Sequence, residues 1–264
     1  MEFSDSLILG ILQGITEFLP VSSSGHLVLG EYYLGLNVET LKSFDVVVHL
    51  GTLLAILVYF KKDVWEILKA LGRLFCRKFE KKDPYLKLIL FIVIGTVPAV
   101  IFAILGEKWI DNTFRNVKAV GIWMFIVGII YLIGEFAYKR RKNHKMNYRK
   151  AFVIGMVQAL ALIPGVSRSG STITAGLFQG IERSSAARFS FLLGIPAIVG
   201  AGLFTAVNLP ENGIEISIIP LFTGFFTSFI FGLLSVAFLM RFLKRNSLIV
   251  FSIYLIALGI SVFV

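Results

Sequence analysis

The sequence is poor in charge and in cysteine, and each shortage excludes a class of protein. Only 16% of the 264 residues are charged, whereas 56% are hydrophobic and 25 are phenylalanine. A single soluble core cannot bury so many apolar side chains, so the chain is predicted to be an integral membrane protein. The one cysteine, Cys76, excludes an internal disulfide scaffold. The acidic N-terminus lacks the cationic region of a cleaved signal peptide, so none is expected.

Basic residues give the chain a net charge of +10, but their distribution argues against a nucleic-acid partner. They fall in short blocks at 61–87, 139–150 and 241–245, each next to apolar runs. The connection at 208–215 carries Glu211 and Glu215 and no basic residue. The positive-inside rule therefore predicts that the basic blocks are cytoplasmic, and that the 208–215 connection, the N-terminal region and the C-terminus lie outside.

Six apolar runs approach the length of about 20 residues that a helix needs to cross a bilayer. They lie near 44–60, 88–106, 117–138, 187–207, 216–240 and 247–264. Two further segments, 7–35 and 151–179, are apolar at their ends but broken in the middle by Pro, Ser and Gly. Each half is too short to cross. Both segments are predicted to be re-entrant helical hairpins, whose irregular backbone must be buried in protein or line a wet cavity.

The two broken segments are related by an internal repeat with an offset of 145 residues. The offset superposes the pairs Gly10 and Gly155, Gln13 and Gln158, Ser22 and Ser167, Ser24 and Ser169, and Gly25 and Gly170. Because an odd number of spans separates equivalent points, the second copy is predicted to run upside down. The predicted fold is an all-α polytopic membrane protein, a single domain over 1–264, with six transmembrane helices and two re-entrant hairpins. Its inverted repeats cover about 5–138 and 150–264.

The break in the second copy has the composition of an anion-binding site. Arg168 carries a planar, permanent charge suited to phosphate oxygens, and the hydroxyls around it are compact donors. Gly170 is expected to let backbone N–H groups approach a ligand closely, and a helix starting at about Ser171 would add its positive end. The predicted phosphate-binding residues here are Ser167, Arg168, Ser169, Gly170 and Thr172.

The break in the first copy supplies the opposite kind of chemistry. Gln13 and Glu17 are four residues apart and share one helical face, and their oxygens are hard ligands appropriate to Mg²⁺ or Ca²⁺. After Pro20 follow Ser22, Ser23, Ser24 and His26, which add hydroxyls and an imidazole. Ser22 and Ser24 are predicted to bind phosphate together with the residues of the second break. If the two breaks meet, their combined side chains are those needed for phosphoryl transfer from a diphosphate.

The segments Q-G-I-T-E-F-L-P-V-S-S-S-G-H and P-G-V-S-R-S-G-S-T-I resemble the two hallmark motifs of the undecaprenyl-diphosphate phosphatase (bacitracin-resistance) family. The resemblance implies a bacterial inner-membrane enzyme that hydrolyses the polyprenyl diphosphate lipid to the monophosphate carrier used in cell-wall synthesis. It also implies a divalent metal and an outward-facing site. Roles carry over by position to Glu17, Ser23, His26, Ser167, Arg168, Ser169 and Thr172. One departure is Gln13, where many members have Glu, so Glu17 is expected to carry more of the metal binding.

The expected mechanism assigns Glu17, with Gln13, to the metal and Arg168 to charge neutralisation on the departing phosphate. His26 or Ser23 supplies the nucleophile or activates it, and direct attack by water stays open. Asp45 and His49, four residues apart, are expected to form a satisfied polar pair rather than an entry gate.

Two other functions would use a similar architecture or similar residues. A carrier that moves polyprenyl phosphate across the bilayer would use the same architecture. The acid-phosphatase superfamily is excluded, because its signature needs a histidine after the S-R pair and none follows His144. The sequence leaves a homodimer and the preferred isoprenoid length open.

Overall fold

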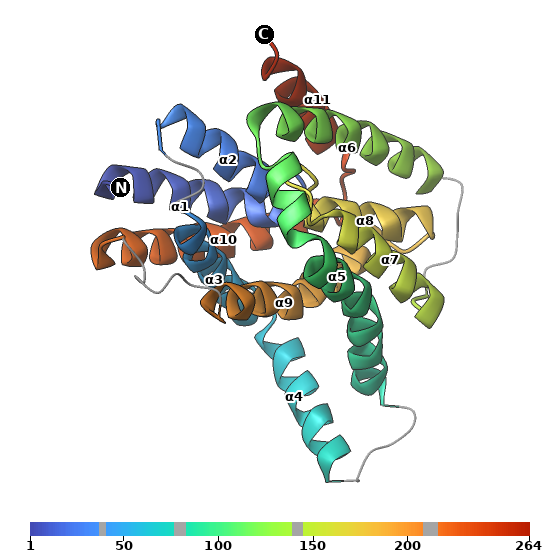
Figure 1. Cartoon of the computed structure of the whole chain (residues 1–264). Helices are drawn as coiled ribbons and strands as arrows, with labels where there is room; N and C mark the ends of the chain where they lie inside the picture. The colour runs from blue at the N-terminus through green and yellow to red at the C-terminus, as the bar shows by residue number, and fades with distance from the viewer. Residues whose placement is uncertain (37–40, 77–82, 139–144, 208–215) are drawn as a thin grey trace.

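The computed structural model describes residues 1–36, 41–76, 83–138, 145–207 and 216–264 (Figure 1). These residues form eleven α-helices and no strand, which confirms the predicted all-α class. The helices are α1 (Phe3–Phe18), α2 (Ser23–Tyr33), α3 (Lys42–Tyr59), α4 (Lys61–Phe75), α5 (Pro84–Phe114), α6 (Val117–Tyr138), α7 (Tyr148–Leu160), α8 (Arg168–Phe178), α9 (Arg183–Val207), α10 (Ile218–Phe242) and α11 (Ile249–Ser261).

Several helices are long and apolar enough to span a membrane, so the chain is a multi-pass membrane protein. Four meet the length and hydropathy needed by themselves, at Pro84–Gly106, Val117–Tyr138, Arg183–Leu203 and Ile218–Phe242. A fifth is counted if α3 and α4 are taken as one bent span. The predicted sixth run, 247–264, forms the shorter apolar helix α11. Within the described residues the structure therefore supports four or five membrane-spanning helices, compared with the six predicted from the sequence.

The basic block at 61–87, which is predicted to be a connection, begins with the helix α4. α4 leaves α3 with a bend of 84° at Phe60. Lys62, Glu66 and Lys69 recur at helical spacing, and Lys69 Nζ pairs with Glu66 at 2.9 Å, so the charged residues line one face of a helix. Parts of the predicted connections lie outside the described residues, namely 77–82 of the block at 61–87, 139–144 of the block at 139–150, which includes His144, and the whole of 208–215.

Both predicted hairpins are pairs of packed helices separated by a short break. The first break, 19–22, contains Pro20, whose ring fixes φ. The residue before this proline, Leu19, is extended. The second break, 161–167, contains Pro164 and Gly165, whose φ of 94° suits glycine. Figure 1 shows the α1–α2 pair and the α7–α8 pair entering from opposite sides, with the two breaks meeting near the centre.

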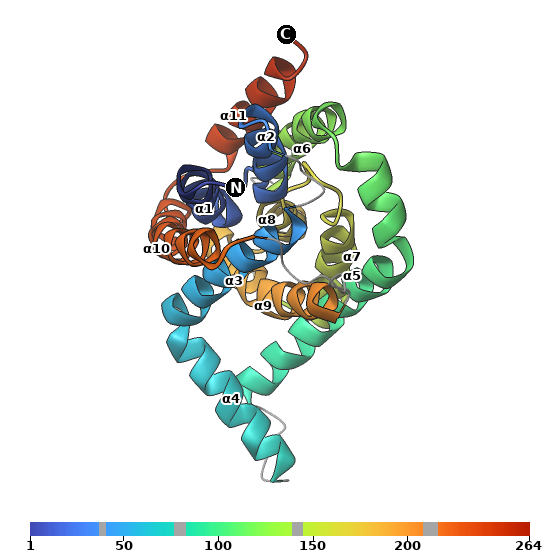
Figure 2. The ribbon, with the colours of Figure 1, turned by 60° about the vertical axis from the view of Figure 1, so that its left-hand side comes forward.

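Two close helix contacts hold these hairpins in place. α1 packs on α10, and α7 packs on α5, on opposite sides of the molecule (Figure 2). A Cβ at Gly10 would lie 2.9 Å from the Gly224 carbonyl oxygen, and one at Gly155 would lie 2.5 Å from the Gly95 carbonyl oxygen. Glycine therefore allows backbone-to-backbone approach in both places, as small residues do in membrane helix pairs.

Candidate active site

Glu17, in the last turn of α1, is the hub of a buried polar cluster at the meeting point of the two breaks. Its Oε1 accepts a hydrogen bond from Arg168 Nη2 at 2.6 Å. Its Oε2 accepts one from Ser23 Oγ at 2.6 Å and one from Gln13 Nε2 at 3.0 Å. The structure thus brings together an acid from one motif and an arginine from the other, 151 residues apart in the chain. Convergence of the two breaks, the central expectation from the sequence, is confirmed.

The two helices that start at the breaks both begin next to this cluster. Ser22 caps α2 by accepting from Gly25 N at 3.3 Å, and Ser167 caps α8 by accepting from Gly170 N at 3.2 Å. Ser22 has a φ of 71°, a left-handed conformation that costs a non-glycine residue about 1–2 kcal/mol. α8 begins at Arg168, earlier than the predicted start near Ser171. Two helix N-termini therefore present partial positive charge at one place.

A cavity of about 320 Å³ opens beside the cluster. Its lining is divided by chemistry. The polar part consists of Glu17, Ser23, Ser24, Asp45, His49, Arg115, Ser167 and Arg168. The remaining lining residues are apolar or glycine and come from α2, α3, α9 and the second break. Such a cavity can hold a charged head group together with the start of an apolar chain.

Five of the predicted site residues line this cavity: Glu17, Ser23, Ser24, Ser167 and Arg168. Gln13 stands directly behind Glu17 and is fully buried. Ser22 is nearly inaccessible and caps α2, so the structure gives it a backbone role in place of the predicted phosphate contact.

Ser169 and Thr172 were predicted to bind phosphate, but their hydroxyls are engaged inside the protein. Thr172 Oγ1 lies 2.6 Å from Ser190 Oγ of α9 and donates to the Arg168 carbonyl oxygen at 2.7 Å. Ser169 Oγ lies 3.2 Å from Ser167 Oγ and 3.4 Å from the Leu19 carbonyl oxygen. Because the first turn of α8 points these side chains at α9 and the first break, they position Arg168 and do not face the cavity.

The structure gives Gly170 a packing role, which differs from the ligand contact that was predicted. A Cβ at this position would lie 1.8 Å from Tyr131 Oη of α6. Tyr131 is fully buried, so a side chain at 170 would collide with a group that cannot move into solvent. The glycine therefore allows α8 to pack against α6, and it is not a point of close approach by a ligand.

His26 does not line the cavity, although the sequence left open that it supplies the nucleophile or activates it. Its Nδ1 lies 2.8 Å from the Ser22 carbonyl oxygen, and its Nε2 lies 2.7 Å from Tyr254 Oη of α11. The ring also stacks on Tyr254, with centroids 5.7 Å apart. Both ring nitrogens are thus used in local contacts, and Ser23 donates its hydroxyl hydrogen bond to Glu17 instead.

His49, on α3, is the imidazole that faces the site. Its Nδ1 donates to the Asp45 carbonyl oxygen at 2.6 Å, and its Nε2 lies 3.6 Å from Glu17 Oε2. The Asp45 carboxylate binds Arg115 Nη2 at 2.5 Å, so Asp45 and His49 form the expected polar pair through the Asp45 carbonyl oxygen and not through its carboxylate. The four-residue spacing did place both on one face of a helix, but Arg115, in the turn between α5 and α6, gave no signal in the sequence.

Gln13 and Glu17 are the described residues best placed to help hold a divalent cation. Gln13 Oε1 is buried without a hydrogen-bond partner, next to the Glu17 carboxylate. Within the described ranges no group of three or more His, Cys, Asp and Glu side chains could hold a metal ion. The two residues therefore fit a cation whose other ligands are phosphate oxygens and water, which is how Mg²⁺ usually binds in such sites.

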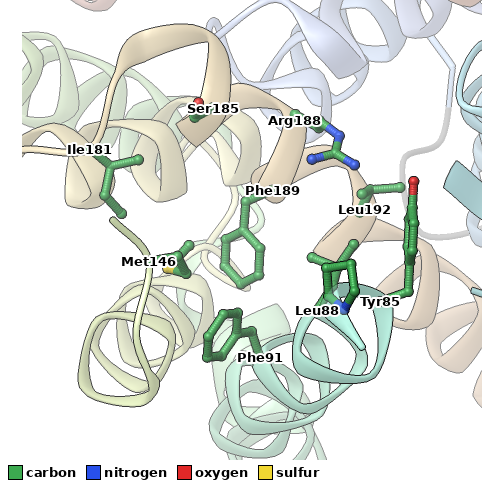
Figure 3. A pocket seen from close by; sticks show the side chains of 10 residues that line it. Tyr85, Leu88, Phe91, Met146, Ile181, Ser185, Arg188, Phe189 and Leu192 are labelled. Carbon is green, nitrogen blue, oxygen red and sulfur yellow. The ribbon is translucent and has the colours of Figure 1, made fainter. Parts of the chain in front are cut away.

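A larger cavity of about 440 Å³ lies between α5 and α9 and has different chemistry (Figure 3). Phe91, Met146 and Phe189 gather around it, and Arg188 stands at its edge. Arg188 is paired with Asp63 of α4. None of the described residues that line it is a carboxylate, so it lacks the acid and base that a hydrolytic centre needs.

Comparison with known proteins gives a consistent result. The family model described as bacitracin resistance protein BacA matches residues 6–261. The chain belongs to this family. Relatives named undecaprenyl-diphosphatase include a Rubrobacter xylanophilus protein, 40% identical over 98% of this chain and 96% of the relative. A Desulfosudis oleivorans protein is 41% identical over 98% and 97%, and undecaprenyl-diphosphatase 4 of Bacillus cereus is 38% identical over 99% and 96%. The resemblance seen in two motifs of this BacA family member therefore extends over nearly the whole chain.

Proposed function

We propose that this BacA family member hydrolyses undecaprenyl diphosphate to undecaprenyl phosphate and inorganic phosphate, and so recycles the lipid carrier for cell-wall synthesis. The observation that carries the proposal is the buried contact between Arg168 and Glu17, with Ser23 on the same carboxylate. The names of relatives that match the chain from end to end support the same activity. They name hydrolases, so transport of polyprenyl phosphate is the less favoured alternative.

The proposed membrane arrangement has six crossings and two re-entrant hairpins, related as an inverted repeat. It is supported by the matched packing of α1 on α10 and of α7 on α5, in which Gly10 and Gly155, 145 residues apart, make equivalent close contacts. In this arrangement the basic blocks face the cytoplasm of a bacterial inner membrane, and the cavity beside Glu17 opens to the outer face.

The proposed binding step is an exchange of partners by Arg168. A buried arginine paired with a carboxylate is already desolvated, so a phosphate that replaces the carboxylate meets a preorganised charge. The N-termini of α2 and α8 add partial positive charge at the same place. The apolar lining from α9 and the second break then receives the first part of the isoprenoid chain.

In the proposed chemical step Ser23 Oγ attacks the terminal phosphorus, and the bond from that phosphorus to the bridging oxygen breaks. Undecaprenyl phosphate leaves with that oxygen, and the Ser23 proton passes to Glu17 Oε2, 2.6 Å away. Glu17 is placed to take this proton because Ser23 Oγ already donates its hydrogen bond to this carboxylate oxygen. Water then attacks the phosphorus of the phosphoserine, the bond from that phosphorus to Ser23 Oγ breaks, and the proton on Glu17 returns to Ser23 Oγ as inorganic phosphate leaves. Direct attack by a water molecule bound to Glu17 is the alternative that the experiment below distinguishes.

A divalent cation, Mg²⁺ or Ca²⁺, is part of the proposal. Gln13 and Glu17 would contribute its protein ligands, and the cation would neutralise charge on the phosphate oxygens when bound. The small number of protein ligands favours Mg²⁺. Chelation is expected to abolish phosphate release, and Mg²⁺ is expected to restore it more effectively than Ca²⁺. Full activity in excess chelator would remove the cation from the mechanism.

The experiment that tests the proposed function measures phosphate release from undecaprenyl diphosphate by purified protein. Ser23→Ala is expected to lower the rate by at least about 100-fold, the scale on which a positioned acid–base partner acts. Rapid quenching with labelled substrate should trap an acid-stable, base-labile phosphoserine in the unmodified protein and none in Ser23→Ala. If no label is trapped although Ser23→Ala is inactive, water is the nucleophile. If the unmodified protein releases no phosphate, the proposed function is wrong.

A further inference from the structure

The cavity beside Glu17 contains a continuous row of polar contacts that ends in an arginine on each side. Arg168 binds Glu17 at 2.6 Å, and Glu17 lies 3.6 Å from His49. His49 donates to the Asp45 carbonyl oxygen at 2.6 Å, and the Asp45 carboxylate binds Arg115 at 2.5 Å. Each arginine therefore binds an acid of this row, and all five residues line the same cavity.

The spacing of this row is set by α3. Asp45 and His49 are four residues apart, so Asp45 lies about one helical turn, about 5.4 Å, along α3 from the imidazole that faces Glu17. Arg115 reaches Asp45 from the turn between α5 and α6, with only 19% of its side chain exposed. The second arginine thus stands further along the same cavity than the first.

The charges of the lining residues indicate that a diphosphate would need both arginines. Among the described lining residues, Arg115 and Arg168 are the permanent cations and Glu17 and Asp45 are the acids. The positive charge of Arg168 is already offset by the negative charge of Glu17. A ligand that carries two phosphates therefore needs a further cation, and Arg115 is the other permanent cation among the described lining residues. Arginine binds phosphate through paired N–H donors in a fixed fork, which suits Arg115 for the same task as Arg168.

Asp45 and Arg115 have a further acid beside them. Glu31, fully buried on α2, lies next to Asp45 and close enough to Arg115 to interact with its charge. Both Glu31 carboxylate oxygens and Asp45 Oδ1 are buried without a hydrogen-bond partner among the described residues. A phosphate that binds Arg115 therefore competes with the negative charge of these two acids.

We propose that Arg115 is a second phosphate-binding residue, which exchanges Asp45 for the phosphate that Arg168 does not hold. The ligand class is a molecule with two linked phosphates. This inference rests on the proposed function, because it concerns the same cavity and substrate. It assigns to Arg115 the preference for a diphosphate over a monophosphate, whereas a purely structural latch between α3 and the α5–α6 turn would give no such preference.

The test compares inhibition by inorganic pyrophosphate and by inorganic phosphate in full-length Arg115→Gln. Removing a charged hydrogen bond costs about 1.5–3 kcal/mol, so the inhibition constant for pyrophosphate and the KM for the lipid diphosphate should each rise by about 10-fold or more. Inhibition by inorganic phosphate should change by less than about 3-fold, because Arg168 still holds it. Lys118→Gln is the matched control, since it removes an exposed positive charge in the first turn of α6 and should behave like the unmodified protein.

The possible results separate this inference from the function on which it rests. No phosphate release by the unmodified protein would overturn both. Normal activity in Arg115→Gln with unchanged pyrophosphate inhibition, or an equal loss for both inhibitors, would overturn the role of Arg115 alone. If Arg115→Gln does not purify as a single species, Arg115→Lys replaces it. Lysine keeps the charge but not the fork, so a smaller loss that is still selective for pyrophosphate is expected, and an unselective loss would contradict the proposal.

Discussion

Arg168 occupies its place because α9 has no side chain opposite it. A Cβ at Gly194 would lie 1.5 Å from Arg168 Nη1. The 145-residue offset of the repeat relates Arg168 to Ser23 and Gly194 to His49. One copy therefore combines a large residue at the helix start with glycine on the facing helix, and the other combines a small residue with histidine. The exchange of size lets Arg168 and His49 both reach Glu17.

Gly194→Ala is expected to remove activity while leaving the fold intact. The added methyl group meets only the end of a long side chain, which can turn aside at little cost to stability. A displacement of about 1 Å of a positioned group is enough to lower kcat/KM by about 100-fold. Phosphate release and the apparent melting temperature in detergent should be measured together. Gly200→Ala, on the same helix with open space around it, is the control and should keep full activity. Wild-type turnover in Gly194→Ala would contradict the placement of Arg168.

At the residue scale the sequence predicts which residues form the site better than it predicts where their side chains point. Glu17, Ser23 and Arg168 were identified from their chemistry, and the structure brings all three together. His26 was assigned to the site by its place in the first motif, but side-chain direction at a helix start depends on neighbours from other helices. Tyr254, 228 residues away, holds its ring, and no local pattern reveals that contact.

At the element scale the broken helices were predictable and their partners were not. Proline, serine and glycine inside apolar segments identified both breaks to within a few residues. Which helix covers each hairpin depends on long-range packing, as with α1 on α10. Glu135 of α6 is a similar case. Fully buried, it binds Arg183 of α9 and accepts from Leu248 N next to α11 at 2.8 Å, so it joins three helices that the sequence treats separately.

Gly155→Ala tests the close contact between α7 and α5. The new Cβ would lie 2.5 Å from the Gly95 carbonyl oxygen, and backbone cannot move aside as a side chain can. Overpacking of this kind costs about 1–3 kcal/mol, so a clear fall in the apparent melting temperature is expected. Gly72→Ala in α4 meets no atom within 4 Å and should be neutral or slightly stabilising. Equal melting of both variants would mean that α5 and α7 do not pack through these glycines.

For the whole molecule, the single cysteine gives a direct test of orientation. Cys76 is exposed and follows α4, in the basic block that the positive-inside rule places in the cytoplasm. A membrane-impermeant thiol reagent should leave Cys76 unlabelled in intact spheroplasts and label it in inverted vesicles. Val264→Cys in a Cys76→Ala background should show the opposite pattern. Labelling of Cys76 from outside would invert the proposed topology and turn the active site toward the cytoplasm.

The most direct test of the whole account is the rate of phosphate release from undecaprenyl diphosphate by Glu17→Gln, Arg168→Gln and the double variant. If the two breaks form one site, each single change should lower the rate by at least about 100-fold, and the double variant should be no slower than the poorer single one. Each variant must first purify as a folded, monodisperse protein. Losses that multiply in the double variant, or single variants that keep most of the activity, would show that Glu17 and Arg168 do not work together and would contradict the account.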